Sequence, residues 1–367
     1  MKQTLYSISQ AVGMNLLSAS FHRHKPIILT FHGVTADVSD TICNDEGLHL
    51  HRPLFERLMK HVARHYHPVP LARIVDWLEG GAAVPERAVA LTFDDGFRNV
   101  LTDAAPVLKK HGIPATLFVT TDFVFKNEML WPDRVVSALA LTRAPALEIN
   151  VGGELRRFDL GTRDAKLHAN AALNALCKSL AQEQRLALLD EIIARLHVDR
   201  SQLQSAWDGF RPIDPEEMRL LPHAGITVGA HTCSHPIMAR LSARQQAHEL
   251  TESKRLIEST TRMECEQFAY PNGGPGDYSA ETRQSVMDAG YRCAFTTVKR
   301  RVSQNDDRFE IPRCTITHNR VTLGEFAAEL GGLPGAVRSL LNRPGARVDA
   351  RSASSPQDAM PSRKKIA

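Results

Sequence analysis

Short apolar runs that alternate with helical patterns dominate the chain from residue 27 onward. The clearest runs are IILTF at 27–31, AVALTF at 88–93 and ATLFVT at 115–120. Runs that are apolar almost throughout are typical of strands buried on both faces of a parallel sheet. Between the second and third runs, Asn99 to His111 has a helical pattern that ends at Gly112. Together these segments predict a strand–helix–strand unit and an α/β fold.

The same alternation continues to about residue 330. Further strands are expected at 226–230, 267–270, 293–297 and 311–317, and helices at 243–260, 280–289 and 323–330. Residues 133–208 interrupt this order with an Ala- and Leu-rich pattern and a Gly-Gly turn, which predict a mainly helical insertion with a small hairpin near 147–158. A chain of 367 residues is long enough for one barrel that carries such an insertion.

The charge of the chain is concentrated near its end. The formal net charge is +4, but residues 338–367 alone hold seven basic and two acidic side chains. The rest of the chain is therefore close to neutral, which argues against a nucleic-acid partner. We expect an amphipathic helix at 1–25, a main domain at 26–335 and a basic, disordered tail at 336–367. An anionic membrane surface is the simplest partner for such a tail.

Cysteine usage and the first residues bear on redox chemistry and location. The six cysteines include no Cys-x-x-Cys pair, so neither a thiolate zinc site nor a redox motif is predicted. Residues 1–21 are too short and too polar for a convincing signal peptide or membrane span. We therefore expect no transmembrane segment and a cytoplasmic location, with the inner membrane face as the alternative.

Side chains able to bind a metal ion follow two of the predicted strands. Asp94 and Asp95 end the run AVALTF, and HTCSHP at 231–236 follows the run ITVGA. Two adjacent carboxylates repel each other unless a cation lies nearby. Each pattern is common without a metal, because Asp often caps helices and the chain has 16 histidines. Together, Asp95, His231 and His235 predict an open metal site with positions left for water and substrate.

These motifs resemble those of a known enzyme family. TFDDG at 92–96, HTCSHP at 231–236 and FAYPNG at 268–273 are similar, in order and spacing, to the first three motifs of the polysaccharide deacetylases. This family is also called the NodB-homology or carbohydrate esterase 4 family. The resemblance covers roughly residues 26–330. It implies a distorted (β/α) barrel and metal-dependent removal of the acetyl group from N-acetylated amino sugars.

The resemblance also implies roles for single residues. Asp94 is similar to the general base of the family, and Asp95, His231 and His235 are similar to its metal ligands. The motif matched by Tyr270 supplies a backbone donor to the oxyanion in this family, and the following Pro271 would fix that loop.

Two histidines are candidates for the acid that protonates the leaving amine. His32, in TFHGV at 30–34, is similar to an early element of deacetylases of the poly-N-acetylglucosamine type. His318 matches the relatives whose acid lies near the end of the domain. We favour His32 because it ends a buried run, and His318 stays open as the alternative.

One departure from the family pattern concerns the surroundings of the base, and one further similarity concerns the sugar. The arginine that often orients the base is absent before Tyr270, and Arg313 is the expected substitute. Trp131, in LWPD at 130–133, is similar to a loop element of exopolysaccharide-associated deacetylases. Its ring either stacks on a sugar or packs inside the protein.

The leading prediction is a metal-dependent hydrolase that removes acetyl groups from an N-acetylated polysaccharide, oligosaccharide or lipid-linked glycan. A deformylase or deacetylase of a small or lipid-linked amino sugar uses the same residues and is an alternative. A non-catalytic, carbohydrate-binding relic of the fold is another, against which the presence of Asp94, Asp95, His231 and His235 argues. Two histidines and one aspartate suit zinc, and cobalt, nickel or manganese fit the same ligands.

Overall fold

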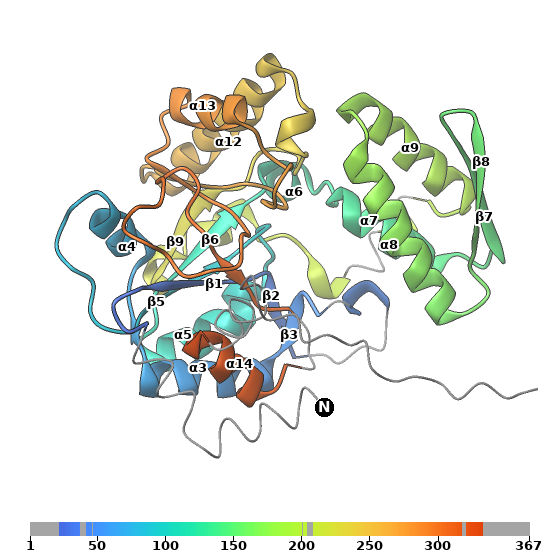
Figure 1. Ribbon diagram of the computed structural model, residues 1–367. Helices are drawn as coiled ribbons and strands as arrows, with labels where there is room; N and C mark the ends of the chain where they lie inside the picture. The colour runs from blue at the N-terminus through green and yellow to red at the C-terminus, as the bar shows by residue number, and fades with distance from the viewer. Residues whose placement is uncertain are drawn as a thin grey trace, which may run out of the picture.

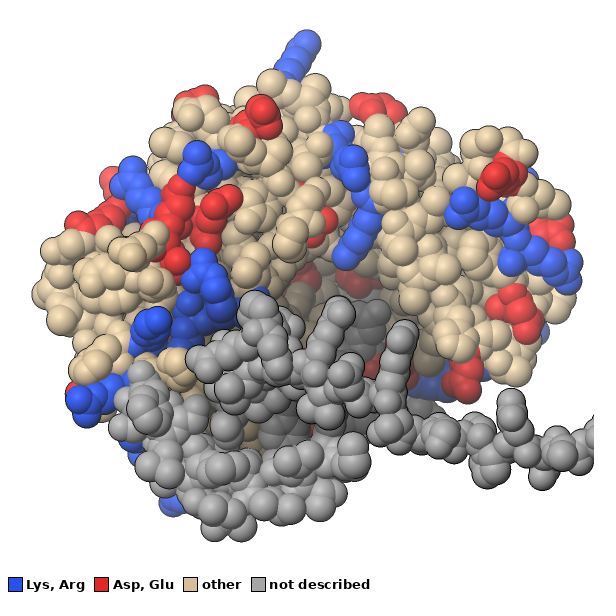
Figure 2. Space-filling view, viewed as in Figure 1, with Lys and Arg blue, Asp and Glu red and all other residues tan. Residues whose placement is uncertain are grey.

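The computed structural model describes residues 22–36, 42–45, 47–199, 201–203, 208–317 and 321–332. The predicted helix at 1–25 therefore lies mostly, and the predicted tail at 336–367 entirely, outside the described residues. Among the helices that are described, none is long and apolar enough to cross a membrane. On the face shown in Figure 2, Lys and Arg side chains are interspersed with Asp and Glu.

A parallel sheet forms the centre of the main domain (Figure 1). Its strands, in spatial order, are β11 (Cys293–Phe295), β10 (Gln267–Ala269), β9 (Ile226–Ala230), β6 (Ala115–Val119), β5 (Ala88–Phe93), β1 (Ile27–Phe31) and β12 (Cys314–Thr315), and β4 (His67–Pro68) also pairs with β5. All these pairings are parallel. Every residue of β1, β5 and β6 is buried, as expected for apolar runs in a parallel sheet.

The segment 308–315 connects the two outer strands of the sheet. The Ala294 N–H donates to the Arg308 carbonyl at 2.8 Å, and the Ile311 N–H donates to the Ala294 carbonyl at 3.0 Å. A few residues later, β12 pairs with β1, with Cys314 opposite Leu29. The sheet thus curls into an incomplete barrel, which confirms the predicted distorted (β/α) barrel.

Helices cover the outside of this curled sheet (Figure 1). They are α3 (Arg52–His65), α4 (Leu71–Leu78), α5 (Ala105–His111), α6 (Thr121–Lys126), α11 (Pro215–Met218), α12 (Ala243–Thr261), α13 (Ala280–Asp288) and α14 (Leu323–Gly331). In α3, Leu54, Phe55, Leu58, Met59 and Val62 are buried. This spacing of three and four residues places them on one helical face, which packs against the sheet.

The remaining elements are short or belong to the insertion. The short ones are the strands β2 (Gly33–Thr35) and β3 (His49–His51), the π-helix η2 (Val100–Ala104), and the 3-10 helices η1 (Ile42–Asn44), η3 (Asp208–Phe210), η4 (Pro222–Ala224) and η5 (Met238–Arg240). The insertion consists of α7 (Trp131–Leu141), β7 (Ala146–Val151), β8 (Glu154–Asp159), α8 (Arg163–Ser179) and α9 (Gln182–Arg195).

The insertion forms a lobe beside the barrel (Figure 1). Its elements share a hydrophobic core of their own, which includes Val135, Leu147, Leu173 and Leu189. The strands β7 and β8 pair as an antiparallel hairpin where the sequence predicts one. The long helical pattern is divided into α8 and α9, because the backbone at Leu180 and Ala181 is extended.

Two expectations for single elements need correction. The strand expected at 311–317 is reduced to Cys314–Thr315 and the isolated bridge at Ile311, because Pro312 has no N–H and cannot continue the ladder. The helix expected from Asn99 begins as the π-helix η2, and regular α-helix starts only at Ala105.

Candidate metal centre and its surroundings

The metal-binding motifs meet at one end of the barrel. Asp94 and Asp95 follow β5, and the loop with His231 and His235 follows β9; in the sheet, only β6 lies between these strands. Both strands are parallel, so their carboxyl ends lie at the same edge, where α/β barrels place their reactive groups. The topology thus brings together residues that are more than 130 positions apart in the sequence.

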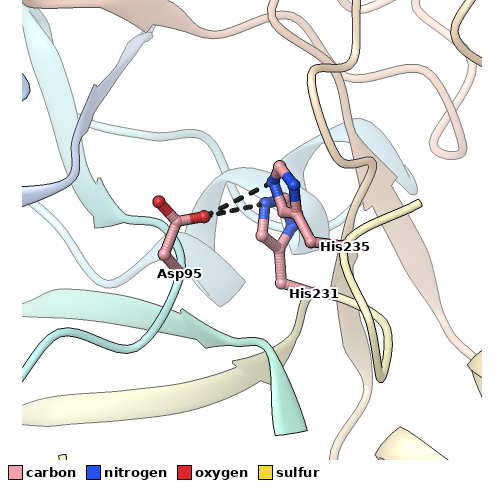
Figure 3. Close-up of side chains that lie close together, drawn as sticks. All are labelled: Asp95, His231 and His235. Atoms are coloured by element: carbon pink, nitrogen blue, oxygen red, sulfur yellow. Dashed lines mark ion pairs between the residues drawn. The ribbon is translucent and has the colours of Figure 1, made fainter. Parts of the chain in front are cut away.

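Asp95, His231 and His235 form a buried cluster (Figure 3). The Asp95 Oδ1 atom lies 3.5 Å from His231 Nε2 and 3.5 Å from His235 Nε2. Figure 3 shows both rings directed at this oxygen. Asp95 Oδ1 is buried and has no hydrogen-bond partner among the described residues.

These distances fit a divalent cation. Two ligand atoms held ~2.1 Å from one ion at a tetrahedral angle lie about 3.4 Å apart, which matches the separations of Asp95 Oδ1 from both imidazoles. The set of one carboxylate and two imidazoles also suits zinc and its neighbours in the transition series. Three protein ligands leave room for water or substrate, as in catalytic sites.

Backbone and side-chain contacts fix the two histidines. His231 Nδ1 lies 2.7 Å from the carbonyl oxygen of Ala269, at the end of β10, so Nε2 is the nitrogen that faces Asp95. His235 is held through the loop: its N–H donates to Thr232 Oγ1 at 3.0 Å. Contacts of this kind orient metal ligands and determine which ring nitrogen is available.

Glu249 of α12 fastens the middle of the same loop. Its Oε2 accepts hydrogen bonds from the N–H groups of Cys233 at 2.7 Å and Ser234 at 3.0 Å, and its Oε1 accepts one from Ser234 Oγ at 2.6 Å. Glu249 is buried. The sequence does not reveal this role, because a glutamate within a helix is usually exposed.

Asp94 forms a buried pair with Arg313. The Arg313 Nη1 and Nη2 atoms donate to Asp94 Oδ1 and Oδ2 at 2.7 and 2.8 Å. Arg313 also donates from Nε to the Thr296 carbonyl and from Nη1 to Thr92 Oγ1. Two parallel bonds to a planar guanidinium fix the carboxylate plane. The arginine expected to replace the missing family residue therefore contacts the expected base.

The electrostatics distinguish the two adjacent aspartates. Burial alone would raise the pKa of Asp94, but Arg313, His231 and His32 outweigh it and lower the pKa below its ordinary value. Burial and the charges of Asp94 and Asp133 raise the pKa of Asp95 well above its ordinary value. A cation bound at Asp95 would offset this repulsion and favour the carboxylate form.

The two histidines of the cluster favour the neutral form that binds metal ions. Burial lowers the pKa of His231 to about 4, although the Asp94 charge opposes the shift. Burial, followed by the charges of His231 and Arg185, lowers the pKa of His235 well below its ordinary value.

His32 lies beside Asp94, whereas His318 lies outside the described residues. Phe31 and Phe93 are paired in β1 and β5, and the Asp94 N–H donates to the Phe31 carbonyl at 2.9 Å. His32 and Asp94 are therefore neighbours at the ends of adjacent strands. Burial is the largest influence on His32 and lowers its pKa, with Asp94 opposing and Arg313 adding to the shift.

The expected role of Tyr270 as a donor to the oxyanion does not agree with its hydrogen bonds. Its backbone N–H donates to the Phe295 carbonyl at 3.0 Å, so it is used within the sheet. Its hydroxyl donates to the Phe309 carbonyl at 3.0 Å, and its ring stacks on Tyr278. Tyr270 and Pro271 are both buried, and they support the loop after β10.

Trp131 packs inside the protein, which corrects the alternative that it stacks on a sugar. Its side chain is only 4% exposed. Its indole Nε1 donates to the His235 carbonyl at 3.1 Å, and the Arg185 guanidinium lies 5.3 Å from the ring centroid. The ring is covered because it lies between α9 and the loop that carries His235.

Comparison with known proteins agrees with the fold and the motifs. The family model described as "Polysaccharide deacetylase" matches residues 81–150 and 158–294, more than half of the chain. The chain belongs to the polysaccharide deacetylase family. Members of this family are generally metal-dependent, in keeping with the Asp95, His231 and His235 cluster.

Curated relatives match parts of the chain. "Putative polysaccharide deacetylase YxkH" of Bacillus subtilis (strain 168) is 20% identical over 232 residues, which are 63% of this chain and 52% of the relative. "Poly-beta-1,6-N-acetyl-D-glucosamine N-deacetylase" of Escherichia coli (strain K12) is 44% identical over 50 residues, which are 14% of this chain and 7% of the relative. The match thus spans about half of the first relative's length and a small part of the second's.

Solved structures share the fold. The Streptococcus pyogenes deacetylase PplD, in complex with acetate, has a TM-score of 0.56 and 16% identity, covering 83% of this chain and 98% of its own. IcaB from Ammonifex degensii has a TM-score of 0.51 and 18% identity, and the match covers 84% of this chain and 97% of IcaB.

Proposed function

We propose that this chain is a metal-dependent N-deacetylase of glycans that contain N-acetylglucosamine. The observation that carries the proposal is the placement of two different acidic sites side by side. Asp95 lies with two imidazoles in a set that fits a cation, and Asp94 lies next to it in a bidentate pair with Arg313. A hydrolase of this kind needs both a site for a Lewis acid and a separate, ionised base.

The choice of substrate is supported by the named relatives. The Escherichia coli relative is named for poly-β-1,6-N-acetyl-D-glucosamine, and its similarity to this chain extends over 50 residues. We therefore propose a polymer or oligomer of N-acetylglucosamine as the substrate. A small or lipid-linked amino sugar is the alternative that the substrate panel below distinguishes.

In the proposed reaction Asp95, His231 and His235 would hold the metal. A divalent cation there would polarise the amide carbonyl and make the attacking water more acidic. Asp94 accepts the proton of the attacking water while the water oxygen forms a bond to the carbonyl carbon. Arg313 keeps Asp94 ionised and fixes the plane of its carboxylate, whose remaining lone pairs accept the proton.

The second half of the reaction requires a proton donor. The carbon–nitrogen bond breaks as the nitrogen accepts a proton, giving acetate and a free amine. We propose His32 for this role because it directly follows the strand next to Asp94. Burial lowers the pKa of His32, so in this scheme the proton that Asp94 accepts from the water passes through His32 to the leaving nitrogen.

The Asp94→Asn and His231→Ala variants test the division of labour between the two sites. We expect Asp94→Asn to bind about one metal ion per chain, because it leaves all three ligands in place, yet to release acetate at least about 100-fold more slowly, as general base catalysis supplies 10²–10⁴-fold. We expect His231→Ala to lose both metal and activity. Metal content by elemental analysis and acetate release from N-acetylglucosamine oligomers are the two measurements.

The same assay with a substrate panel separates the alternatives. Free N-acetylglucosamine, its oligomers and a lipid-linked form are compared, and acetate and formate are measured separately. Acetate release from oligomers supports the proposal. Full activity in Asp94→Asn, or formate as the main product, contradicts it.

A further inference from the structure

A small cavity lies between the insertion and the loop that carries His235. Its volume is about 80 Å³, and its walls come from α6, α7, the start of α9 and the loop residues Cys233 and Ser234. One water needs about 10–15 Å³ on this measure. The cavity therefore has room for about five to eight waters, which is enough for a ligand of four or five non-hydrogen atoms.

Arg185, near the start of α9, is part of the cavity wall. It is only 1% exposed. Its Nη2 donates to Gln182 Oε1, while Nε and Nη1 are buried without a hydrogen-bond partner among the described residues. A guanidinium keeps its charge inside a protein, and a buried charge is strongly unfavourable unless a counter-charge satisfies it.

The acidic residues near this cavity bind other groups or face solvent. Asp122 pairs with Lys126 at 2.8 Å, and Glu128 is exposed. Glu249 accepts its hydrogen bonds from the loop at Cys233 and Ser234. The other cation of the wall, Arg134, has a carboxylate partner, Asp190, at 3.0 Å. Of the two arginines in the wall, Arg185 is thus the one with no carboxylate bonded to it in the described chain.

We propose that this cavity binds a small oxyanion, a carboxylate or a phosphate group, on Arg185. The bound group would adjoin the metal centre, because Arg185 lies over Trp131 and the Trp131 indole donates to the His235 carbonyl. A carboxylate arises as the acetate product of a deacetylase, and a phosphate arises as inorganic phosphate or a substituent of a glycan. The site itself does not depend on the proposed activity.

Anion titration of the zinc-loaded full-length chain tests this proposal. Potassium acetate and potassium phosphate are added at constant ionic strength, with potassium chloride as the salt control, and tryptophan fluorescence and Tm are recorded. We expect at least one oxyanion to change both signals, and Arg185→Met to weaken this binding at least about tenfold, because a charged hydrogen-bond donor is lost. A response to acetate alone indicates that the site binds the acetate product. A response to phosphate alone indicates that it binds a phosphate group.

Three further variants make the result specific. Arg195→Met removes an exposed arginine of the same helix, which pairs with Glu191, and should bind the oxyanion as the wild type does. His231→Ala removes anions held by the metal and should retain the binding on Arg185. Arg185→Lys keeps the charge and should bind within about tenfold of the wild type. The proposal would be overturned if Arg185→Met bound the oxyanion as well as the wild type does, or if His231→Ala lost the binding. It would also be overturned if the wild type responded to neither oxyanion.

The Tm without added oxyanion gives an independent test. Arg185→Met replaces a buried, unpaired charge by an apolar side chain of similar length, so it should be at least as stable as the wild type in chloride buffer. When the oxyanion is added, the wild type should gain more stability than Arg185→Met. A variant that is less stable in chloride and gains as much from the oxyanion would contradict the assignment to Arg185.

Discussion

The two adjacent aspartates show how single contacts give identical side chains different properties. Asp94 is bonded to the Arg313 guanidinium, which lowers its pKa, while Asp95 is buried against two neutral imidazoles and the Asp94 charge, which raises its pKa. Asp94 is thereby kept ionised, and Asp95 is the carboxylate that gains most from a nearby cation. The motif TFDDG predicted both residues, but the contact with Arg313 depends on the path of a distant segment.

Glu249 provides a prediction at the residue scale. Glu249→Ala should weaken metal binding about 10–100-fold, the range for residues that orient metal ligands, because the N–H groups of Cys233 and Ser234 lose their acceptor. Glu249→Gln retains one acceptor oxygen and should recover most of the affinity. Zinc titration of chelator-treated protein is the measurement.

The matched control is Glu252→Ala. Glu252 lies on the same helix but pairs with Arg255 at the surface, so its loss should leave the zinc affinity unchanged. Equal zinc affinity in Glu249→Ala and the wild type would show that the loop does not need this support.

At the scale of elements, β2 is packed tightly against η2 and β3. A Cβ at Gly33 would lie 2.2 Å from His49 Nδ1 and 2.4 Å from Asn99 Oδ1. The Asn99 side chain bonds to His49, whose ring packs against Phe97 and Phe210. Gly33 is thus required by close approach, directly after His32 and the end of β1.

Gly33→Ala should lower the free energy of unfolding by about 1–3 kcal/mol, the usual cost of overpacking a well-packed core. Gly161→Ala is the control, because the nearest atom to its added Cβ is an Asp159 side-chain oxygen at 3.3 Å, which can move. Urea unfolding of both variants is the measurement. A destabilisation no larger than that of Gly161→Ala would show that β2 can shift to accept the methyl group.

Predictability from the sequence differed among the elements. The buried strands β1, β5 and β6 were predicted because their runs are apolar on both faces, and the motif residues were predicted because they follow such runs. The closure of the barrel cannot be predicted from the sequence, because β12 has only two residues and Pro312 interrupts the hydrogen-bond ladder before it. The roles of Glu249 and Arg185 cannot be predicted from the sequence, because the burial of these side chains results from the tertiary packing of α12 and α9.

At the scale of the whole molecule, several buried histidines link stability to pH. His49 is the clearest example outside the metal centre. Burial lowers its pKa to about 3, and His32 adds to this shift, whereas the hydrogen bond with Asn99 opposes it. The ordinary pKa of histidine in an unfolded chain is about 6.5. The folded chain therefore binds fewer protons than the unfolded chain between these values, and stability is lost as the pH falls from about 6.5 towards 3.

His49→Gln should reduce this acid sensitivity. Between pH 6 and pH 4 the wild type should lose up to about 1.4 kcal/mol more per pH unit than the variant, which corresponds to one proton. Urea unfolding at pH 7, 6, 5 and 4, in chelator so that metal binding does not contribute, gives the two slopes. Parallel slopes would mean that His49 does not remain neutral in the folded chain.

The barrel, the cluster and the Asp94–Arg313 pair together lead to one central claim, which is metal-dependent N-deacetylation. The most direct test is acetate release from N-acetylglucosamine oligomers by one preparation in three states: as purified with zinc, after removal of the metal by a chelator, and after zinc is added back. We predict activity, loss of activity and recovery of activity, in that order. Acetate release that continues unchanged in the chelated, demonstrably zinc-free protein would contradict the account.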